Sequence, residues 1–236
     1  MTFLTTRLHF TPLQLSDTVA LHDLRTSPET MKWSRQKVID KNHTETENWI
    51  RKMTDEPLLN LGTGLLENPG EEGQGKEKDR SKTGLVFAVR EIDHVHAMQS
   101  SQNQGEGAIP DRIIAIVGIR ATESPLTDIP QFEIGYMFVP RAWGRGYASE
   151  AVKGVVRWWF SFLQSRGQSG SQGSKGEGQE GNKVKDKDGV YAIVAKGNPA
   201  SLRVMEKCGF KKINEGFDND GSGIEIVEFR IGRERV

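Results

Sequence analysis

The stretch RAWGRGYA, residues 141–148, contains residue types suited to binding an anion. The β-branched and aromatic run before it predicts a strand, and the apolar residues after it recur at helical spacing. A turn from a strand into a helix presents free N–H groups and the positive end of the helix dipole, where proteins bind phosphate. Gly144 and Gly146 would let the backbone approach the anion, and Arg141 and Arg145 would add positive charge at the rim. The pattern also fits a plain structural turn, because such turns favour glycine.

Two familiar phosphate motifs do not fit this stretch. A Walker loop needs Gly-Lys-Ser/Thr, and no lysine follows Gly146. A dinucleotide-binding fingerprint needs a third glycine at the position of Ser149. The phosphate hypothesis therefore needs support from the elements around the turn.

The surrounding segments predict an α+β, mixed α/β fold. Alternating or β-branched runs predict strands at 8–14, 84–91, 112–121, 131–139, 189–195, 209–217 and 223–232, and apolar residues three and four apart predict helices at 16–25, 44–53, 148–163 and 198–210. The three strands before the turn follow one another and are expected to pair antiparallel. The helix that begins at Ala148 is expected to span about four turns.

Helix-capping residues mark several of these boundaries. Ser16 is expected to cap the first helix, and Thr44 and Glu47 have the spacing of a capping box. Asn198 suits the start of the last helix, and Gly209 suits the left-handed residue after its end.

Three tracts, at about 61–83, 98–111 and 164–189, are rich in Gly, Ser, Gln, Glu and Lys and poor in apolar residues. Such composition buries too little surface to offset the entropy of ordering, so these tracts are expected to be long flexible inserts. The segments between them are too short to be separate domains. We therefore expect a single domain over residues 1–236.

The stretch 141–148 resembles the Arg/Gln-x-x-Gly-x-Gly/Ala signature of the GCN5-related N-acetyltransferase (GNAT) superfamily. FEIGYMFVPRAWGRGYASEAV is similar to the central strand, loop and helix of its ribosomal-protein N-terminal acetyltransferase subgroup. NPASLRVMEKCGF resembles that subgroup's Asn-x-x-Ser-x-x-x-x-Glu-Lys-x-Gly-Phe segment, and residues 5–33 resemble its usual opening. The resemblance covers nearly all the chain outside the inserts and implies a central, mostly antiparallel sheet flanked by helices.

The resemblance implies that acetyl-CoA is the cosubstrate and that no metal is required. The backbone of the strand before the signature would pair with the pantetheine arm, the amides of the turn would bind the pyrophosphate, and the start of the last helix would contact the pantetheine or acceptor end. The residues implied are Phe138, Val139, Arg141, Trp143, Gly144, Arg145, Gly146, Tyr147, Ala148, Asn198 and Ser201. For Asn198 the alternative is a simple helix cap, and for Ser201 a surface serine.

Transfer of an acyl group to a protonated amine requires a base, and Glu133 and Ser201 are the candidate catalytic residues. Glu133 lies on the strand before the signature, on the face opposite Ile134. The alternative for Glu133 is a solvated or salt-bridged carboxylate. Relatives often place a tyrosine where this chain has Met205, so Ser201, a water or no residue would protonate the leaving thiolate. Tyr136 is interpreted as a core aromatic.

Composition excludes several other classes of protein. Lys plus Arg equals Asp plus Glu at 32 each, so no nucleic-acid partner is indicated. The single cysteine, Cys208, rules out an intrachain disulfide and is expected to pack in an apolar environment. His94 and His96 have no evident third metal ligand. No apolar segment reaches membrane-spanning length, so we expect the cytoplasm, with the nucleus as the alternative, and a monomer or homodimer.

The sequence therefore predicts an N-acetyltransferase that transfers acetyl directly to a primary amine. A protein N-terminus, an amino acid and a small amine all fit as acceptors. The alternative is a noncatalytic acyl-CoA-binding or scaffold protein that keeps the same fold.

Overall fold

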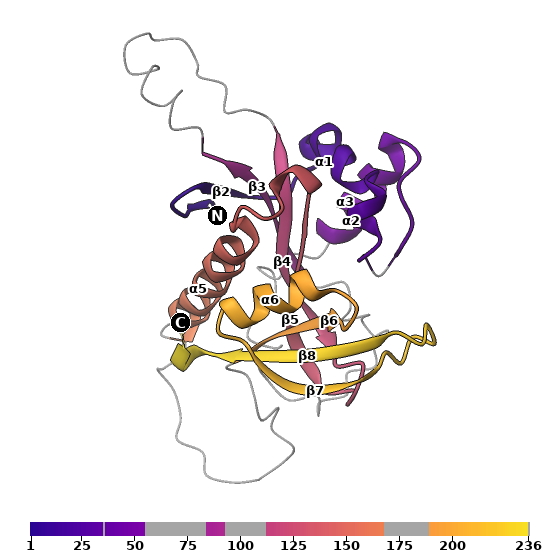
Figure 1. Ribbon diagram of the computed structural model, residues 1–236. Helices are drawn as coiled ribbons and strands as arrows, with labels where there is room; N and C mark the ends of the chain where they lie inside the picture. Colours follow the sequence, from indigo (N-terminus) through magenta and orange to yellow (C-terminus); the bar gives the residue numbers. More distant parts are fainter. Residues whose placement is uncertain (35, 55–83, 93–111, 168–188, 236) are drawn as a thin grey trace, which may run out of the picture.

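The computed structural model describes residues 1–34, 36–54, 84–92, 112–167 and 189–235 (Figure 1). The predicted inserts at 61–83 and 98–111 lie wholly outside these ranges, and so does most of the third.

The described strands form one eight-stranded sheet in the order β1-β2-β3-β4-β5-β6-β8-β7. Neighbouring strands are antiparallel except β5 and β6, which are parallel. The strands are β1 (Phe3–Leu4), β2 (Leu8–Pro12), β3 (Gly84–Glu91), β4 (Ile113–Glu123), β5 (Pro130–Phe138), β6 (Gly189–Ala195), β7 (Lys211–Phe217) and β8 (Glu225–Gly232). The predicted mixed fold with three consecutive antiparallel strands is therefore confirmed.

The described helices are α1 (Thr18–Arg25), α2 (Pro28–Met31), α3 (His43–Thr54), α5 (Tyr147–Gly167) and α6 (Pro199–Lys207). Figure 1 shows α1, α2 and α3 grouped at one end of β4, and α5 and α6 lying beside the sheet. α5 contacts β2, β4 and β5, whereas α6 contacts β6. The short elements β1 and α2 were not predicted.

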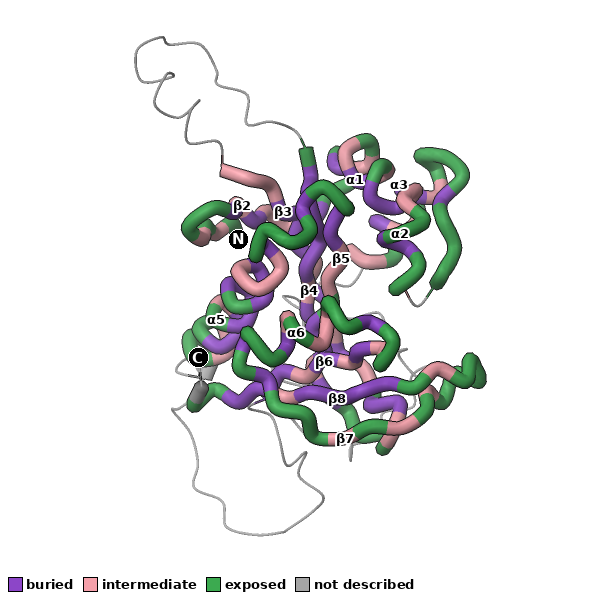
Figure 2. Tube along the Cα trace, viewed as in Figure 1, coloured by how far each residue is buried: buried purple, intermediate pink, exposed green. Residues whose placement is uncertain are grey.

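The core lies where α5 packs against the middle of the sheet. The stripe predicted for α5 is buried at Val152, Val155 and Trp159, and β4 is buried along most of its length, as Figure 2 shows. Trp158 turns to a different side and stacks on Phe3 with ring centroids 6.2 Å apart. Burial of large apolar side chains stabilises such a core by about 1.5–3 kcal/mol each.

Two predicted helix starts are wrong. The start of α3 is capped by Asn42, whose side-chain oxygen accepts from the Glu45 amide at 3.0 Å, while the Glu45 carboxylate accepts from the Lys41 amide at 2.9 Å. Thr44 and Glu47 therefore lie inside the helix. A 3₁₀ turn precedes α1 in place of a Ser16 cap.

The helix α5 is longer than predicted. It runs to Gly167, so residues 164–167 of the predicted third insert are helical, and Gly189 at the insert's other end begins β6. The composition of 164–167 resembles that of the insert, and the apolar spacing ends at Leu163, so periodicity alone placed the boundary too early.

The strands β5 and β6 diverge. Their register contains one pair, Glu133 with Tyr191, whereas the antiparallel neighbours are in register along most of their lengths. Beyond this pair the two strands no longer bond to each other. The divergence opens the sheet beside the predicted phosphate turn.

A buried ion pair joins α1 to the segment that precedes α3. The Arg25 guanidinium in α1 donates to both carboxylate oxygens of Asp40, at 2.5 and 2.7 Å, and both side chains are less than a tenth exposed. Thr46 of α3 donates to the same carboxylate at 2.8 Å, and Arg25 lies over the Trp49 ring. Burial by itself would raise the pKa of Asp40, but the hydrogen bonds from Arg25 and Thr46 outweigh it and lower that pKa.

Replacing Arg25 with Met should lower the free energy of unfolding by about 3–5 kcal/mol, because the Asp40 carboxylate would remain buried without its partner. Urea unfolding measures this value. The double variant Arg25→Met/Asp40→Leu should recover most of the loss, and Arg51→Met, which breaks the exposed pair with Glu47, should cost less than about 1 kcal/mol. Equal losses in the single and double variants would contradict this account.

The same pair gives a pH dependence of known sign. The pKa of Asp40 is lowered in the folded protein. The contribution of Asp40 to the free energy of unfolding is therefore complete above the ordinary aspartate pKa, and it is lost as the pH falls through the lowered pKa. Unfolding free energies measured from neutral to acidic pH should therefore decline more steeply in the parent than in Arg25→Met/Asp40→Leu. Parallel curves would show that the pair does not titrate with folding.

Candidate active site

The two glycines of the turn are required by backbone conformation. Gly144 has φ +73° and Gly146 has φ +79°, a region that other residues rarely adopt. A Cβ atom at Gly144 would meet no heavy atom within 4 Å, and one at Gly146 would meet only the Arg7 side chain at 3.5 Å. Open space therefore lies in front of the turn.

The amides of the turn are available to a ligand. The amides of Ala142 and Trp143 bond to the carbonyls of Val139 and Pro140. The first bond of α5 runs from the Glu150 amide to the Gly146 carbonyl at 3.1 Å. Between them, the described structure gives the amides of residues 144–148 no protein acceptor. The prediction that the Trp143 amide binds a ligand is thus at odds with its bond to Pro140, whereas the other predicted amides remain available.

The two arginines of the stretch are already partnered. Arg141 donates to the Ile113 carbonyl at 3.3 Å. Arg145 pairs with Glu91 at 3.2 Å and lies 4.8 Å from the centroid of the Tyr147 ring. The Tyr147 hydroxyl donates to Glu91, and burial together with this carboxylate raises the pKa of Tyr147. These contacts brace the turn against β3 and β4.

At the end of β5, the Phe138 carbonyl faces the opening beside β6, whereas the Val139 amide faces β4. The Phe138 carbonyl accepts from the Trp143 indole at 2.8 Å and from the Thr30 hydroxyl of α2 at 3.2 Å. The Val139 amide instead donates to the Ile114 carbonyl at 2.9 Å. The predicted Val139 contact with a ligand is therefore not supported through its amide. Because backbone groups alternate in direction along a strand, those of Tyr136 and Phe138 face the gap beside β6.

The start of α6 places the other predicted residues at the same opening. Asn198 caps the helix through its side-chain oxygen, which accepts from the Ser201 amide at 3.1 Å. The Asn198 carboxamide nitrogen keeps its two donor hydrogens, and the described structure gives it no acceptor. Helix capping and ligand contact are therefore compatible in this residue.

The neighbours of Ser201 include a buried hydroxyl. The Tyr136 hydroxyl lies beside Ser201 but is buried without a hydrogen-bond partner, and burial raises the pKa of Tyr136 to about 12. Met205 is fully buried, so it cannot contact a substrate. Burial also raises the pKa of Cys208 to about 11, and its thiol donates to the Ser149 carbonyl at 3.5 Å. The predicted packing role of Cys208 is consistent with these contacts.

Two cavities meet at the divergence of β5 and β6. One of about 290 Å³ begins at the turn, and another of about 380 Å³ lies between β5 and β6. The residues that line both are Trp33, Tyr136, Met137, Asn198 and Ser201. Trp33, which sequence reasoning did not identify, is brought here by the short helix α2. The junction is where a donor and an acceptor entering from opposite sides would meet.

Glu133 lies in the wall of the larger of these cavities. Its carboxylate pairs with the Arg120 guanidinium at 2.8 Å, with Glu133 8% and Arg120 39% exposed. The salt-bridged alternative for Glu133 is therefore present in the structure. Its predicted role as a base stays a prediction.

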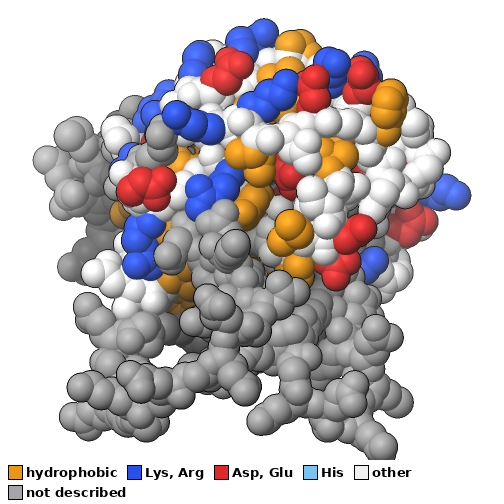
Figure 3. Space-filling view, turned by 90° about the horizontal axis from the view of Figure 1, so that it is seen from below, with side chains coloured by type: hydrophobic (Ala, Val, Ile, Leu, Met, Phe, Trp, Pro, Cys, Tyr) orange, Lys and Arg blue, Asp and Glu red, His pale blue; other side chains and the backbone are white. Residues whose placement is uncertain are grey.

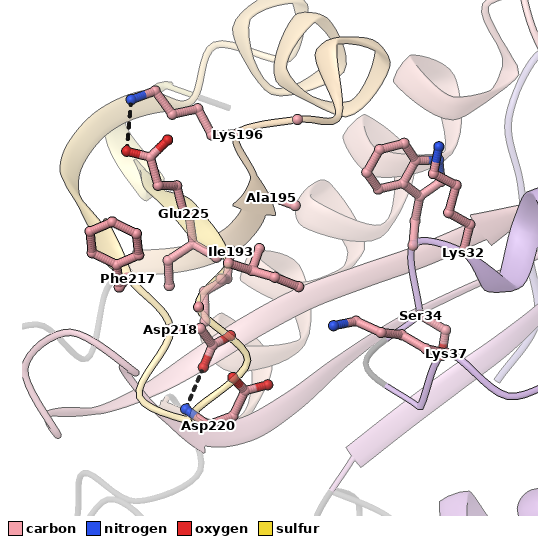
Figure 4. A pocket seen from close by; sticks show the side chains of 15 residues that line it. Lys32, Ser34, Lys37, Ile193, Ala195, Lys196, Phe217, Asp218, Asp220 and Glu225 are labelled. Carbon is pink, nitrogen blue, oxygen red and sulfur yellow. Dashed lines mark hydrogen bonds and ion pairs between the residues drawn. The ribbon is translucent and has the colours of Figure 1, made fainter.

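A third cavity, of about 790 Å³, adjoins the junction through Trp33 and Ser34 (Figure 4). Figure 4 shows Lys37 reaching from one wall toward Asp218 and Asp220 on the turn between β7 and β8. Lys32 lies on the same side as Lys37. The walls of this outer cavity therefore carry opposite charges.

Other functional features are not seen in the described part of the chain. There, no group of three or more His, Cys, Asp or Glu could hold a metal ion, and His94 and His96 lie outside the described ranges. Among the same residues, no helix is both long and apolar enough to cross a membrane. On the described part of the face in Figure 3, basic and acidic side chains are interspersed.

Comparison with known proteins identifies the family. The model of the acetyltransferase (GNAT) domain family matches residues 7–211. The chain therefore belongs to the GNAT acetyltransferase family, which confirms the predicted family and the enzyme class that it defines.

Solved structures share the fold. A GNAT-family acetyltransferase from Bacillus anthracis superposes with a TM-score of 0.60 at 17% identity, covering 99% of both chains. Spermidine N-acetyltransferase from Vibrio cholerae, solved with CoA and spermine, gives 0.57 at 15% identity over 98% of both chains. The ribosomal-protein-S5-alanine acetyltransferase from Vibrio fischeri gives 0.57 at 15% identity, over 100% of this chain and 99% of that one.

One curated relative shares a shorter region. The uncharacterized protein YkkB from Bacillus subtilis (strain 168) is 36% identical over 77 residues, which is 33% of this chain. The match covers 32% of YkkB, about a third of its length.

Replacing Gly146 with Asn should weaken acetyl-CoA binding by about ten- to a hundredfold. Asn tolerates the left-handed conformation, so the fold should survive, but its side chain would enter the space in front of the amides. One charge-assisted hydrogen bond contributes about 1.5–3 kcal/mol, which corresponds to this range. Calorimetric titration and circular dichroism on the same sample measure both effects.

Gly221→Asn is the matched control, because Gly221 has φ +76° with no heavy atom within 4 Å and lies on the distant turn between β7 and β8. This variant should bind acetyl-CoA like the parent. A folded Gly146→Asn protein with parental affinity would show that no phosphate reaches the turn.

Proposed function

We propose that the protein transfers an acetyl group from acetyl-CoA directly to a primary amine. The observation that carries the proposal is the junction of two cavities at the divergence of β5 and β6, one of which begins at the turn with unpartnered amides. Two substrates entering through the two cavities would meet beside Asn198 and Ser201. Family membership supports the same reaction class.

The residues present fit acetyl-CoA. The amides of residues 144–148 and the positive end of α5 bind the pyrophosphate. The pantetheine arm lies along β5 beside Tyr136 and Phe138, whose backbone groups face the gap. Because Thr30 and Trp143 already donate to the Phe138 carbonyl, the arm uses the Phe138 amide and the groups of Tyr136.

The start of α6 stabilises the charge that develops in transfer. As the new C–N bond forms and the C–S bond breaks, negative charge passes from the thioester oxygen to the sulfur. The Asn198 carboxamide nitrogen and the positive end of α6 are donors and dipoles at the junction. We assign to the Ser201 hydroxyl the relay of a proton to the leaving thiolate, and Ser201 regains this proton from solvent. Tyr136, with its pKa at about 12, keeps its own proton.

We assign removal of the amine proton to Glu133, directly or through a water. Its carboxylate lines the cavity of about 380 Å³, into which the acceptor amine projects. The ion pair with Arg120 holds the carboxylate in one orientation in the cavity wall. The proton passes from the attacking amine to the carboxylate and then to solvent.

The variant Glu133→Gln should lower kcat by about a hundredfold or more and leave acetyl-CoA affinity unchanged, because general base catalysis is worth at least that factor. Part of the loss should return at higher pH, where more of the amine is unprotonated. Arg120→Met is the matched control. It breaks the same ion pair but keeps the carboxylate, so it should retain most of the parental kcat. Equal losses in the two variants would show that Glu133 serves only as an ion-pair partner.

The charged side chains that line the outer cavity indicate an acceptor that carries both a positive and a negative charge. Lys32 and Lys37 line one side of the outer cavity and face Asp218 across it (Figure 4). A polyamine would meet the two lysines unfavourably. A peptide whose free N-terminus enters the cavity lined by Glu133 would place a nearby acidic side chain in the outer cavity, where the two lysines can pair with it.

Peptides with an acidic second or third residue should therefore be acetylated with a higher kcat/KM than spermidine. Lys37→Glu should lower the ratio of kcat/KM for these peptides to kcat/KM for spermidine by up to about fivefold, since an exposed charge pair contributes up to about 1 kcal/mol. Lys212→Glu, on the edge strand β7 where Lys212 pairs with Glu215, should leave the ratio unchanged. A parental preference for spermidine would refute this acceptor class. Acetyl-CoA binding without turnover on any amine would instead favour the noncatalytic alternative.

A further inference from the structure

Two glycines on neighbouring strands leave backbone without side chains in the cavity of about 380 Å³ between β5 and β6. Gly135 in β5 pairs with Gly118 in β4, and both line this cavity. We call this pair the glycine floor. Val86 of β3 pairs with Gly118 and continues the same face of the sheet. Adjacent strands are about 4.8 Å apart, so the distance across the sheet from Gly135 to Val86 is about 10 Å.

The glycine at position 135 has no local structural requirement. Glycine weakens the interior of a strand, and there it usually marks a bulge or the close approach of another backbone or a ligand. The register of β4 with β5 has no shift, and the φ angle of Gly135 is not positive. A Cβ atom on Gly135 would meet no heavy atom within 4 Å. The remaining reason for glycine here is a ligand that lies against the backbone.

Gly118 is glycine for a different reason. A Cβ atom at this position would lie 2.5 Å from the Leu85 carbonyl oxygen and 3.0 Å from the Cα atom of Val86. The close approach of β3 and β4 therefore requires glycine. As a consequence, the surface without side chains extends from β5 onto β4.

Large apolar side chains surround the glycine floor. Trp49 and Met53 line the cavity from α3, which packs against β3. Trp33 lines it at the junction with the cavity that begins at the turn, and Ile193 lines it from β6. Trp33 is 41% exposed and Trp49 is half-buried, so both indoles offer surface to a ligand. A flat floor beside two indoles favours an aromatic ring, because aromatic pairs gain more than the area that they bury.

The glycine floor adjoins the reacting groups of the proposed function. Residues two apart on a strand share a face and are about 7 Å apart, so Gly135 lies midway between Glu133 and Met137. Met137 lines both cavities at the junction, together with Asn198 and Ser201. An amine held between Glu133 and the junction therefore has its own substituent over Gly135.

We propose that the glycine floor binds the aromatic side chain of the acceptor's first residue, so that the protein acetylates peptides that begin with phenylalanine or tryptophan. The inference rests on the proposed function, since it requires a peptide N-terminus to enter this cavity. The ring lies on the backbone of Gly135 and Gly118, between Trp33 and Trp49. The acidic residue that follows in the peptide extends past Trp33 into the outer cavity, which Trp33 also lines.

The test uses peptides that share an acidic third residue and differ only in the first, which is alanine, leucine or phenylalanine. Their kcat/KM values are measured with saturating acetyl-CoA. The phenylalanine peptide should exceed the alanine peptide by about ten- to a hundredfold, the factor that burial of one large apolar side chain supplies. The leucine peptide should lie between them, because leucine lacks the aromatic contacts.

Gly135→Val should abolish this preference, because the valine side chain would occupy the space above the floor. The ratio of kcat/KM for the phenylalanine peptide to kcat/KM for the alanine peptide should fall to within about threefold of one, since most of the burial is lost. Valine favours a strand, so the fold should survive. An unchanged acetyl-CoA affinity in calorimetric titration shows that the variant is folded.

Gly216→Val is the matched control on the edge strand β7. A Cβ atom on Gly216 would meet only the end of the Leu126 side chain, at 3.0 Å. This variant should keep the parental ratio. Met53→Ala tests the pocket from α3 without changing the floor, and it should lower the ratio by about three- to tenfold, because part of the wall that covers the ring is removed.

Equal kcat/KM of the parent for the alanine and phenylalanine peptides would overturn the proposed pocket and leave the proposed function standing. The parental ratio in folded Gly135→Val or in Met53→Ala would also overturn it, because the ring would then bind elsewhere. Loss of the preference in Gly216→Val would refute the assignment to the glycine floor. Failure of the parent to acetylate any peptide or amine would refute the proposed function, and with it this inference.

Discussion

The divergence of β5 and β6 after the Glu133–Tyr191 pair is the constraint on which the rest of the structure depends. Backbone polar groups buried without partners are costly, so each strand edge exposed by the divergence needs another partner. The end of β5 obtains one from Thr30 and Trp143, which both donate to Phe138. Groups left without such partners line the cavities. The cavities therefore lie where the backbone hydrogen bonds between β5 and β6 end.

The surrounding elements hold that opening in shape. The helix α5 packs against the sheet through a buried stripe and begins at the turn, so its positive end is fixed beside the gap. The helix α6 starts at Asn198 on the other side, and the Cys208–Ser149 contact joins the two helices. The Arg25–Asp40 pair secures α1 and α3, near α2, which carries Thr30 and is followed by Trp33. Two helix dipoles therefore converge on one junction, where a thioester would develop negative charge.

Under the proposed function, the junction has a donor side and an acceptor side, and the charges on the two sides differ. The charged side chains that line the cavity beginning at the turn are Arg203 and Lys207, whereas the outer cavity carries both signs. The carboxylate of Glu133 lies on the acceptor side, paired with Arg120. A polyanionic donor and a zwitterionic acceptor would thus approach from different directions.

Local patterns in the sequence were sufficient to predict strands β2 to β8, the stripe of α5, the Asn198 cap and the glycine turn, because each depends on neighbouring residues. The resemblance carried by the turn and the last helix supplied the family. Three-dimensional contacts decided the rest: Arg120 is the partner of Glu133, the Val139 amide bonds to β4, and Trp33 lines the junction. Such contacts join residues from different elements, so they depend on strand register and helix placement. Periodicity along the chain does not encode either.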